Sequence, residues 1–410
     1  MAIQGLRDTS NFVANARPQN YREGILLLYP NGKAPLVALT SLMKSRTVDD
    51  PVFNWWEKAL DSQRVALGAS LNAVAGTQNV TVVSGAKTLK EGDVLYVEQS
   101  GEQIFVTTDP GSDTVIQAQR GWAGTTPTAV TYNGAGINPN LLKMGNAYEQ
   151  GSLAPTGISF DPSQKTNNTQ IFRDTLEATR TAMKTRLRTG DAIKEAKREC
   201  LEYHSIGMER QFWLGKKSST TKNGKPLTTM DGVNSFIPSA NIKVATTDYG
   251  SGVTLAGLEE YMYNIFKFGS SEKVGFCGNR AALTIQQILR KGTGVQWNIN
   301  LGVKEFGMNV MRITSPFGEI ILKTHPLFNQ VAGGATAGTD YYGMESWLFV
   351  LDMENITYVS FNGADTHYEP DLQANGMDGI KSGYLSESSI EVHHAQTHYL
   401  IKNLVASAAG

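Results

Sequence analysis

A stretch of about 25 residues near the middle of the chain, 191–215, constrains the fold more than any other feature. Its apolar positions step by three and four residues, which puts them on one continuous face of a helix. These positions are Ile193, Ala196, Cys200, Tyr203 and Gly207. Asp191 is expected to cap the first turn. At 1.5 Å per residue the helix is roughly 37 Å long, so the sequence predicts a structural spine.

Residues 76–132 carry a different pattern, typical of short strands. The β-rich runs are separated by turns that contain glycine, and they comprise residues 80–83, 93–97, 103–107 and 114–118. Strands this short and this closely spaced predict a small antiparallel β module. The glycine-rich stretch 121–127 is expected to form its edge.

The first 33 residues are polar and punctuated by glycine and proline, which predicts an extended arm. Because chain ends fray unless something holds them, we expect neighbouring copies to hold this arm. A short helical pattern follows at residues 36–43. Since the chain starts at Met1, we expect no long N-terminal segment to be removed from it.

The rest of the chain contains both helical and strand patterns of apolar residues. Helices are expected at residues 171–187, before the spine, and at 255–268 and 280–289, after it. Strands are expected at 273–276, in a hairpin of 308–314 and 319–324, and at 347–351, 356–361 and 380–392. Because strands and helices do not alternate regularly, the pattern favours the α+β class over a doubly wound sheet.

The charge balance excludes some classes of function. Lysine plus arginine number 37 and aspartate plus glutamate 38, and charged residues make up 18% of the chain, against roughly 25% in an ordinary soluble domain. This balance excludes nucleic-acid binding by a strongly basic surface. The low charge content and the 41 glycines favour a surface that contacts other protein chains. No basic and apolar leader and no run long enough to span a bilayer is present, so we expect a protein made in the cytoplasm and outside membranes.

The sequence contains no P-loop, dinucleotide fingerprint or nucleophile elbow. The best metal-like cluster is His393, His394 and His398, near Glu391. On a helix, residues four apart share a face, but the flanking residues predict strands, where they lie roughly 13 Å apart. We therefore expect surface or interface histidines.

Other reactive groups have simple structural interpretations. Cys200 and Cys277 are expected to be reduced thiols, and Cys200 behaves as a small apolar residue on the helix stripe. The acidic pairs Asp49-Asp50 and Glu259-Glu260 are expected at caps or exposed faces. A set of basic residues at 184–198 could bind phosphate, but we expect it to form a solvated helical face because Glu195, Glu199 and Glu202 dilute its charge. The set comprises Lys184, Arg186, Arg188, Lys194, Lys197 and Arg198.

Five of the six tryptophans are expected to be core or interface anchors rather than a base-stacking platform: Trp55, Trp56, Trp122, Trp213 and Trp347. We thus predict no catalytic residue, no cofactor and no metal site.

The order of these elements resembles the major capsid proteins of tailed bacteriophages, which share the Hong Kong 97 fold. The resemblance is closest to the branch typified by the major head protein of phage SU-ten. The stretches that carry it are 35–39 with 50–57, 92–95 with 120–125, 143–151, and 208–215 with 230–233.

The resemblance implies a division of the chain. It implies an N-terminal arm at 1–45 and, at 46–150, an extended loop that lies across a neighbouring subunit and is enlarged by the β-rich insertion at about 76–132. A peripheral domain would comprise 151–234 and 346–410, with the spine helix at about 191–215, and an axial domain would comprise 235–345.

The resemblance also implies a function. The chain would assemble with itself, as pentamers and hexamers, into an icosahedral head that encloses double-stranded DNA without sequence-specific binding. Its other partners would be portal, scaffolding and decoration proteins, and it would reside in the virion after assembly in the bacterial cytoplasm. Two alternatives stay open at this point: another virion component, such as a tail-tube or decoration protein, and a hydrolase that uses His394 or His398.

Overall fold

The computed structural model describes residues 43–58, 63–134, 139–185, 192–250, 252–291, 299–305, 308–329 and 343–407. The chain divides into two compact units, a smaller one of Trp56–Gln164 and a larger one of the remaining residues. Strands β2 (Val52–Glu57) and β9 (Ser163–Asn168) pair in a two-stranded sheet. Most of the expected arm, the helical pattern at 36–43 and the expected cap Asp191 lie outside the described residues.

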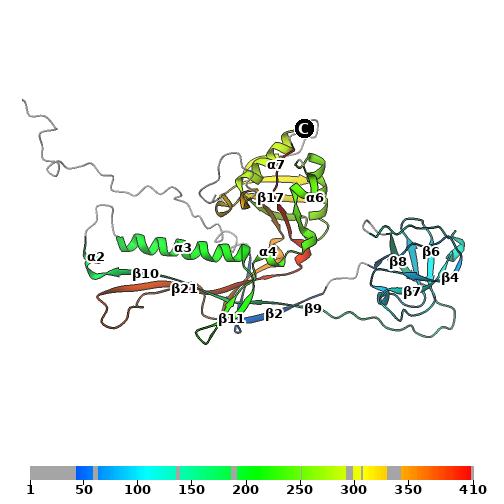
Figure 1. Cartoon of the computed structure of the whole chain (residues 1–410), viewed down its shortest axis with the longest axis horizontal. Helices are drawn as coiled ribbons and strands as arrows, with labels where there is room; N and C mark the ends of the chain where they lie inside the picture. The colour runs from blue at the N-terminus through cyan, green and yellow to red at the C-terminus, as the bar shows by residue number, and fades with distance from the viewer. Residues whose placement is uncertain are drawn as a thin grey trace, which may run out of the picture. The chain divides into compact units, whose positions relative to one another are not determined.

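The smaller unit is a closed β-barrel, drawn in cyan in Figure 1. Its six strands follow the spatial order β3-β8-β5-β6-β7-β4, and neighbours are antiparallel. Just past the two end strands, the Gly68 amide donates to the Thr81 carbonyl and the Val83 amide to the Ala66 carbonyl, both at 2.9 Å. These bonds join the first strand to the last. The strands are β3 (Arg64–Ala66), β4 (Gly76–Thr81), β5 (Asp93–Val97), β6 (Gln103–Val106), β7 (Val115–Arg120) and β8 (Asn140–Asn146).

Gly68 makes this closure possible. A Cβ atom at this position would lie 2.8 Å from the carbonyl carbon of Val82, so a larger residue would push the two ends of the sheet apart. Closure of a sheet satisfies its edge strands, and the alternating apolar side chains fill the interior. Leu95, Ile104 and Ile116 are among these fully buried residues.

The four strands expected in this module are confirmed, but the module is larger than residues 76–132. It also includes β3 and β8. Strand β8 has one fully buried apolar residue, Leu141, and its sequence does not alternate clearly, so the strand pattern was too weak to recognise.

The larger unit contains two main sheets. The first has the order β1-β19-β21-β10, with β20 also paired to β21. Strand β1 runs parallel to β19, and the other pairs are antiparallel. The strands are β1 (Lys44–Val48), β10 (Gln170–Thr179), β19 (Ile356–Phe361), β20 (His367–Glu369) and β21 (Gly379–Val392). Helix α3 (Ala192–Leu214) packs along β10 and β21, as Figure 1 shows.

The prediction of a helix at 171–187 is wrong. Every residue from Gln170 to Thr179 pairs with β21, and only the short helix α2 (Arg180–Lys184) follows. The apolar residues Phe172 and Leu176 are four apart, a spacing that shares a face in a strand as well as in a helix. Pairing with a long neighbouring strand decides between the two.

The long helix expected at 191–215 is confirmed as α3, but its buried face differs from the expected stripe. Tyr203 is 70% exposed, whereas His204 is buried. The two ring nitrogens of His204 lie 2.8 Å from Asp174 Oδ2 and 2.7 Å from Ser386 Oγ. Because these partners satisfy it, a polar residue occupies the core-facing side, and apolar periodicity alone points to the wrong side.

The second sheet has seven strands in the order β13-β22-β18-β14-β17-β16-β15. The pairs β13·β22 and β14·β17 are parallel and the others antiparallel. Its strands are β13 (Ile242–Val244), β14 (Glu272–Cys277), β15 (Ile299–Glu305), β16 (Met308–Ser315), β17 (Gly318–Thr324), β18 (Leu348–Leu351) and β22 (Tyr399–Lys402), and its helices are α5 (Ala245–Tyr249), α6 (Leu255–Ile265) and α7 (Asn279–Lys291). The strands and helices expected in this region are confirmed.

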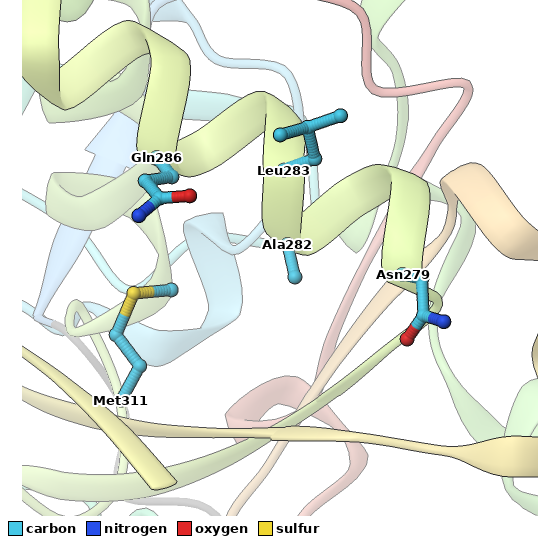
Figure 2. Close-up of a pocket in the computed structure, with 5 residues that line it drawn as sticks. All are labelled: Asn279, Ala282, Leu283, Gln286 and Met311. Atoms are coloured by element: carbon cyan, nitrogen blue, oxygen red, sulfur yellow. The ribbon is translucent and has the colours of Figure 1, made fainter. Parts of the chain in front are cut away.

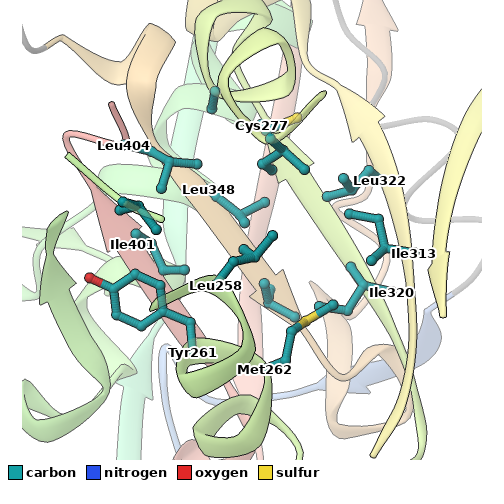
Figure 3. Packing of buried hydrophobic residues seen from close by; sticks show 14 of the residues in the cluster. Leu258, Tyr261, Met262, Cys277, Ile313, Ile320, Leu322, Leu348, Ile401 and Leu404 are labelled. Carbon is teal, nitrogen blue, oxygen red and sulfur yellow. The ribbon is translucent and has the colours of Figure 1, made fainter. Parts of the chain in front are cut away.

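The central strands of this sheet are buried on both faces. In β18, Leu348 and Val350 face the core that includes α6 and α7, shown in Figure 3. Phe349 and Leu351 face a second core that includes Trp213 of α3. This alternation with period two joins the two sheets through shared apolar contacts. Strands β18 and β22 belong to segment 346–410, which is expected in the peripheral domain, yet they pair with strands of the expected axial segment 235–345. The division into peripheral and axial domains therefore stays a prediction.

A ribbon follows α3. It consists of β11 (Ser218–Lys222) and β12 (Lys225–Thr229), which turn at Asn223 and Gly224, both with positive φ, 53° and 72°. Such a turn matches the natural twist of a two-stranded ribbon. The short helix α4 (Val233–Phe236) comes next. In the described part of the chain, no helix combines the length and apolar character needed to cross a membrane.

Candidate assembly surfaces

The segment after the barrel is a candidate contact surface. Every residue from 144 to 164 is exposed, and Leu153 is 91% exposed. Two hydrogen bonds join it to the barrel: the Tyr148 hydroxyl donates to the Glu91 carbonyl (2.8 Å), and the Thr156 hydroxyl donates to Asp109 (2.9 Å). Exposed apolar side chains that gather along one stretch mark sites of protein–protein contact.

The outer face of α3 is a second candidate. Tyr203 and Leu214 are both exposed, and a separation of eleven residues, close to three turns, puts them on one face. Gly207 lies between them and carries no side chain, so the face is shallow there. The stripe expected to face the core therefore faces outward in part.

A hollow of about 310 Å³ lies between α7 and β16 (Figure 2). Its lining residues are Asn279, Ala282, Leu283, Gln286 and Met311. None of these side chains titrates, so the lining offers no acid, base or nucleophile. Its size and its mixture of apolar and amide groups suit a side chain of another protein.

The three candidate histidines have different environments. His398 is fully buried, whereas His394 is exposed and His393 is half-buried beside Glu391 (Nε2 to Oε1, 3.0 Å). Burial lowers the pKa of His398 to about 4. The expectation of a surface or interface histidine is therefore wrong for His398, because the residue that leads into β22 is already in the core. Over the described ranges, no group of three or more His, Cys, Asp and Glu side chains could hold a metal ion.

Both cysteines are buried. Burial raises the pKa of Cys277 to about 12, and it also raises the pKa of Cys200. Protonated thiols are poor nucleophiles, so both cysteines act as small apolar residues.

The acidic pairs and the basic set make ordinary local contacts. Asp50 accepts a hydrogen bond from the Val52 amide at 2.9 Å, and Glu260 accepts one from the Tyr249 hydroxyl at 2.7 Å. Arg198 lies 3.8 Å from Glu195 and 3.9 Å from Glu202, as a solvated face predicts. Arg186 and Arg188 fall outside the described residues.

The tryptophans divide between core and surface. Trp55 and Trp213 are buried in apolar clusters, whereas Trp56 is 63% exposed. Trp122 stacks on Phe105 with 4.3 Å between ring centroids, and Trp347 lies beneath the Lys402 ammonium at 4.7 Å. They do not line one surface as a stacking platform would.

The barrel contains a buried ion pair that no sequence pattern predicts. Arg120 and Glu102 are both fully buried and make two hydrogen bonds, at 2.7 and 2.6 Å. Arg120 also donates to the carbonyls of Asn72 (2.8 Å) and Thr128 (3.0 Å). Burial opposes ionisation of Glu102, but hydrogen bonds from Arg120 and two backbone amides hold its pKa below the usual value. The pair therefore connects four segments of the barrel.

A second buried cation, Lys273, lies near the start of β14, the central strand of the seven-stranded sheet. Its ammonium donates to the carbonyls of Ile265 (2.8 Å), Phe268 (2.7 Å) and Thr397 (2.7 Å). Burial lowers its pKa to about 8, although Asp352 raises it. Ile265 is the last residue of α6 and Phe268 lies just after it, so Lys273 caps the end of that helix and joins it to the turn that precedes β22.

The protonation of His398 predicts a pH dependence of stability. Unfolded histidine has a pKa near 6.5, so below that pH the unfolded chain takes up a proton that the folded chain excludes. We expect the free energy of unfolding to fall by up to about 1.4 kcal/mol per pH unit between about pH 6.5 and 4 from this group. His398→Asn, which keeps an acceptor for the Asp352 amide, should remove that slope. Urea titrations at pH 7, 6 and 5 measure it, and a wild-type–variant difference constant with pH would contradict the assignment.

Comparison with known proteins places these surfaces in context. Residues 7–405 match a family described as SU10 major capsid protein. The major capsid protein of Pseudomonas phage PaMx41 is 28% identical over 369 residues, which cover 88% of this chain and 82% of that protein.

Two solved structures are similar over most of their length. The capsid of an empty GTA particle has a TM-score of 0.49 and 9% identity, covering 97% of this chain and 98% of that chain. The SrpI encapsulin complex from Synechococcus elongatus PCC 7942 has a TM-score of 0.46 and 9% identity, covering 98% and 97%.

Proposed function

The chain belongs to the SU10 major capsid protein family, and from this premise we propose that its copies assemble as pentamers and hexamers into an icosahedral head around double-stranded DNA. It is a structural capsid protein of a phage and not an enzyme. The observation that carries the proposal is the family match, which extends over residues 7–405.

The exposed surfaces support assembly with other copies. A closed shell needs contacts between different surfaces of neighbouring subunits, repeated around fivefold and sixfold axes. The exposed segment 144–164, the Tyr203–Leu214 face of α3 and the hollow beside α7 offer three such surfaces. Long segments supply area, since obligate interfaces often exceed about 2,000 Å².

We propose the domain roles from the same family assignment. The N-terminal arm comprises 1–45, the extended loop 46–150, the peripheral domain 151–234 with 346–410, and the axial domain 235–345. The compact unit Trp56–Gln164 supports the role of the extended loop, because it is a separate folded body within that part of the chain. In the assembled head this loop would lie across a neighbouring subunit.

The balanced charge supports enclosure of DNA rather than a tight grip on it. With 37 basic and 38 acidic residues, the chain presents no large excess of positive charge to a packaged genome. Portal, scaffolding and decoration proteins would complete the head, which would be assembled in the bacterial cytoplasm.

The experiment is expression of the full chain, alone and with its viral partners, followed by negative-stain microscopy. We expect closed isometric shells. Tubes would indicate a tail-tube protein, and a chain that stays monomeric at high concentration with every partner present would contradict the proposal.

A further inference from the structure

The ribbon β11–β12 and the two residues before it carry a run of positive charge without any acidic residue. Residues 216–229 contain four lysines and no aspartate or glutamate, in a chain whose net charge is −1. The lysines are Lys216, Lys217, Lys222 and Lys225. Every residue from 216 to 227 is exposed, so both faces of the ribbon meet solvent.

Three of these charges are available to a ligand. The Lys217 ammonium is held by the Thr166 hydroxyl (2.7 Å) and carbonyl (3.2 Å). Lys216, Lys222 and Lys225 have no side-chain hydrogen bond or ion pair with any residue that the structure describes. Their ammonium groups therefore remain free for an outside anion.

The tip of the ribbon carries a local repulsion. Lys222 and Lys225 are direct cross-strand partners on either side of the Asn223–Gly224 turn. Like charges in this position destabilise an antiparallel pair. Natural sequences break such local rules mainly at functional sites. A bound anion would remove the repulsion between these two lysines.

The base of the ribbon is fixed to the body of the larger unit. The Thr228 hydroxyl donates to the Thr169 carbonyl (2.8 Å), and the Asn168 amide donates to the Ser219 hydroxyl (3.0 Å). The Thr229 hydroxyl donates to the Lys216 carbonyl (2.8 Å). The charged tip therefore extends from an anchored support, which reduces the conformational entropy lost on binding.

We propose that this ribbon binds the phosphate backbone of double-stranded DNA. A two-stranded ribbon fits the major groove, and lysines, serine and threonine hydroxyls and backbone amides are the groups that contact phosphates. Residues 216–229 contain no arginine and no aromatic residue, so the ribbon lacks the bidentate and stacking groups that read bases. The contact is independent of DNA sequence.

The inference rests on the proposed function and refines it, because it places a small number of DNA contacts at one point of a subunit that is otherwise balanced in charge. Each neutralised phosphate contributes a slope of about −0.9 to the dependence of log affinity on log salt concentration. Three lysines thus give a slope of about −2.7, which is weak for one copy and additive over many copies.

The test compares two triple variants of the full, unassembled chain. One is Lys216→Gln with Lys222→Gln and Lys225→Gln. The matched control removes three exposed lysines outside the ribbon: Lys58→Gln, Lys87→Gln and Lys267→Gln. Fluorescence anisotropy with a labelled 30-base-pair duplex, between 50 and 200 mM NaCl, gives affinity and salt slope.

We expect the ribbon variant to bind at least tenfold more weakly at 50 mM NaCl and its salt slope to become shallower by about 2 to 3. The control should bind like the wild type. Equal weakening in both variants, or no weakening in the ribbon variant, overturns the inference.

Formaldehyde cross-linking of DNA-filled heads tests the same contact in the particle. Cross-links from Lys222 and Lys225 to nucleotides support the inference, whereas cross-links from these lysines to another copy of the chain, without nucleotides, overturn it. The two proposals fail separately. Wild-type chain that makes no shells defeats the proposed function, and shells whose DNA contacts are unchanged in the ribbon variant defeat only this inference.

Discussion

Replacing Arg120 with methionine is expected to destabilise the β-barrel by about 3–5 kcal/mol. The substitution leaves the Glu102 carboxyl fully buried without its partner, and it removes the bonds to the Asn72 and Thr128 carbonyls. Breaking a buried pair from one side is far more costly than removing both charges. Hydrogen exchange of the full chain, read in β4 to β7, measures the loss.

The control for this prediction is the double variant Arg120→Met with Glu102→Gln. Its neutral amide oxygen can still accept from the Gly121 amide, which donates to Glu102 at 3.0 Å. We expect the double variant to be more stable than Arg120→Met alone. A single variant as protected as the wild type would show that the pair does not hold the barrel together.

Excision of the barrel is expected to abolish closed shells or leave fragile ones, while the larger unit stays folded. The barrel can be cut out between residues 63 and 143, which are adjacent in space because the Lys143 amide donates to the Gln63 carbonyl at 2.9 Å. Replacing residues 64–142 with Gly-Ser-Gly therefore joins two adjacent points. The apolar cluster of the barrel contains barrel residues alone, so the cores around α6, α7 and Trp213 keep their contacts.

Two measurements separate folding from assembly in this variant. Hydrogen exchange should show β14 and β18 protected as in the wild type, and negative-stain microscopy should show few intact shells. As a control, replacing residues 220–227 with Asn-Gly shortens the ribbon and should leave shells intact. Normal shells after barrel excision would contradict the proposed role of the extended loop.

The sequence predicts strands well where alternation is strong. Strand β5 was expected at 93–97 and occupies Asp93–Val97, because its residues alternate between the barrel interior and its surface. The prediction fails at β10, where the Phe172–Leu176 spacing fits both periods and a distant partner, β21, decides. Such long-range pairing leaves no local signature.

The polar interior was the part that sequence patterns could not reveal. Arg120, Lys273 and His398 are buried because partners distant in sequence satisfy or surround them. Helix α3 shows the same limit, since His204 takes a core-facing position and Tyr203 does not. The surfaces proposed for assembly are therefore inferred from the exposure of side chains in the folded chain. The resemblance to the family, in contrast, can be inferred from the order of the sequence motifs.

A three-dimensional electron-microscopy reconstruction of particles formed by this chain is the decisive test of its assembly. We expect a closed icosahedral shell built of pentamers and hexamers of this chain. A helical tube, or a shell in which this chain forms no pentamers and hexamers, would contradict it.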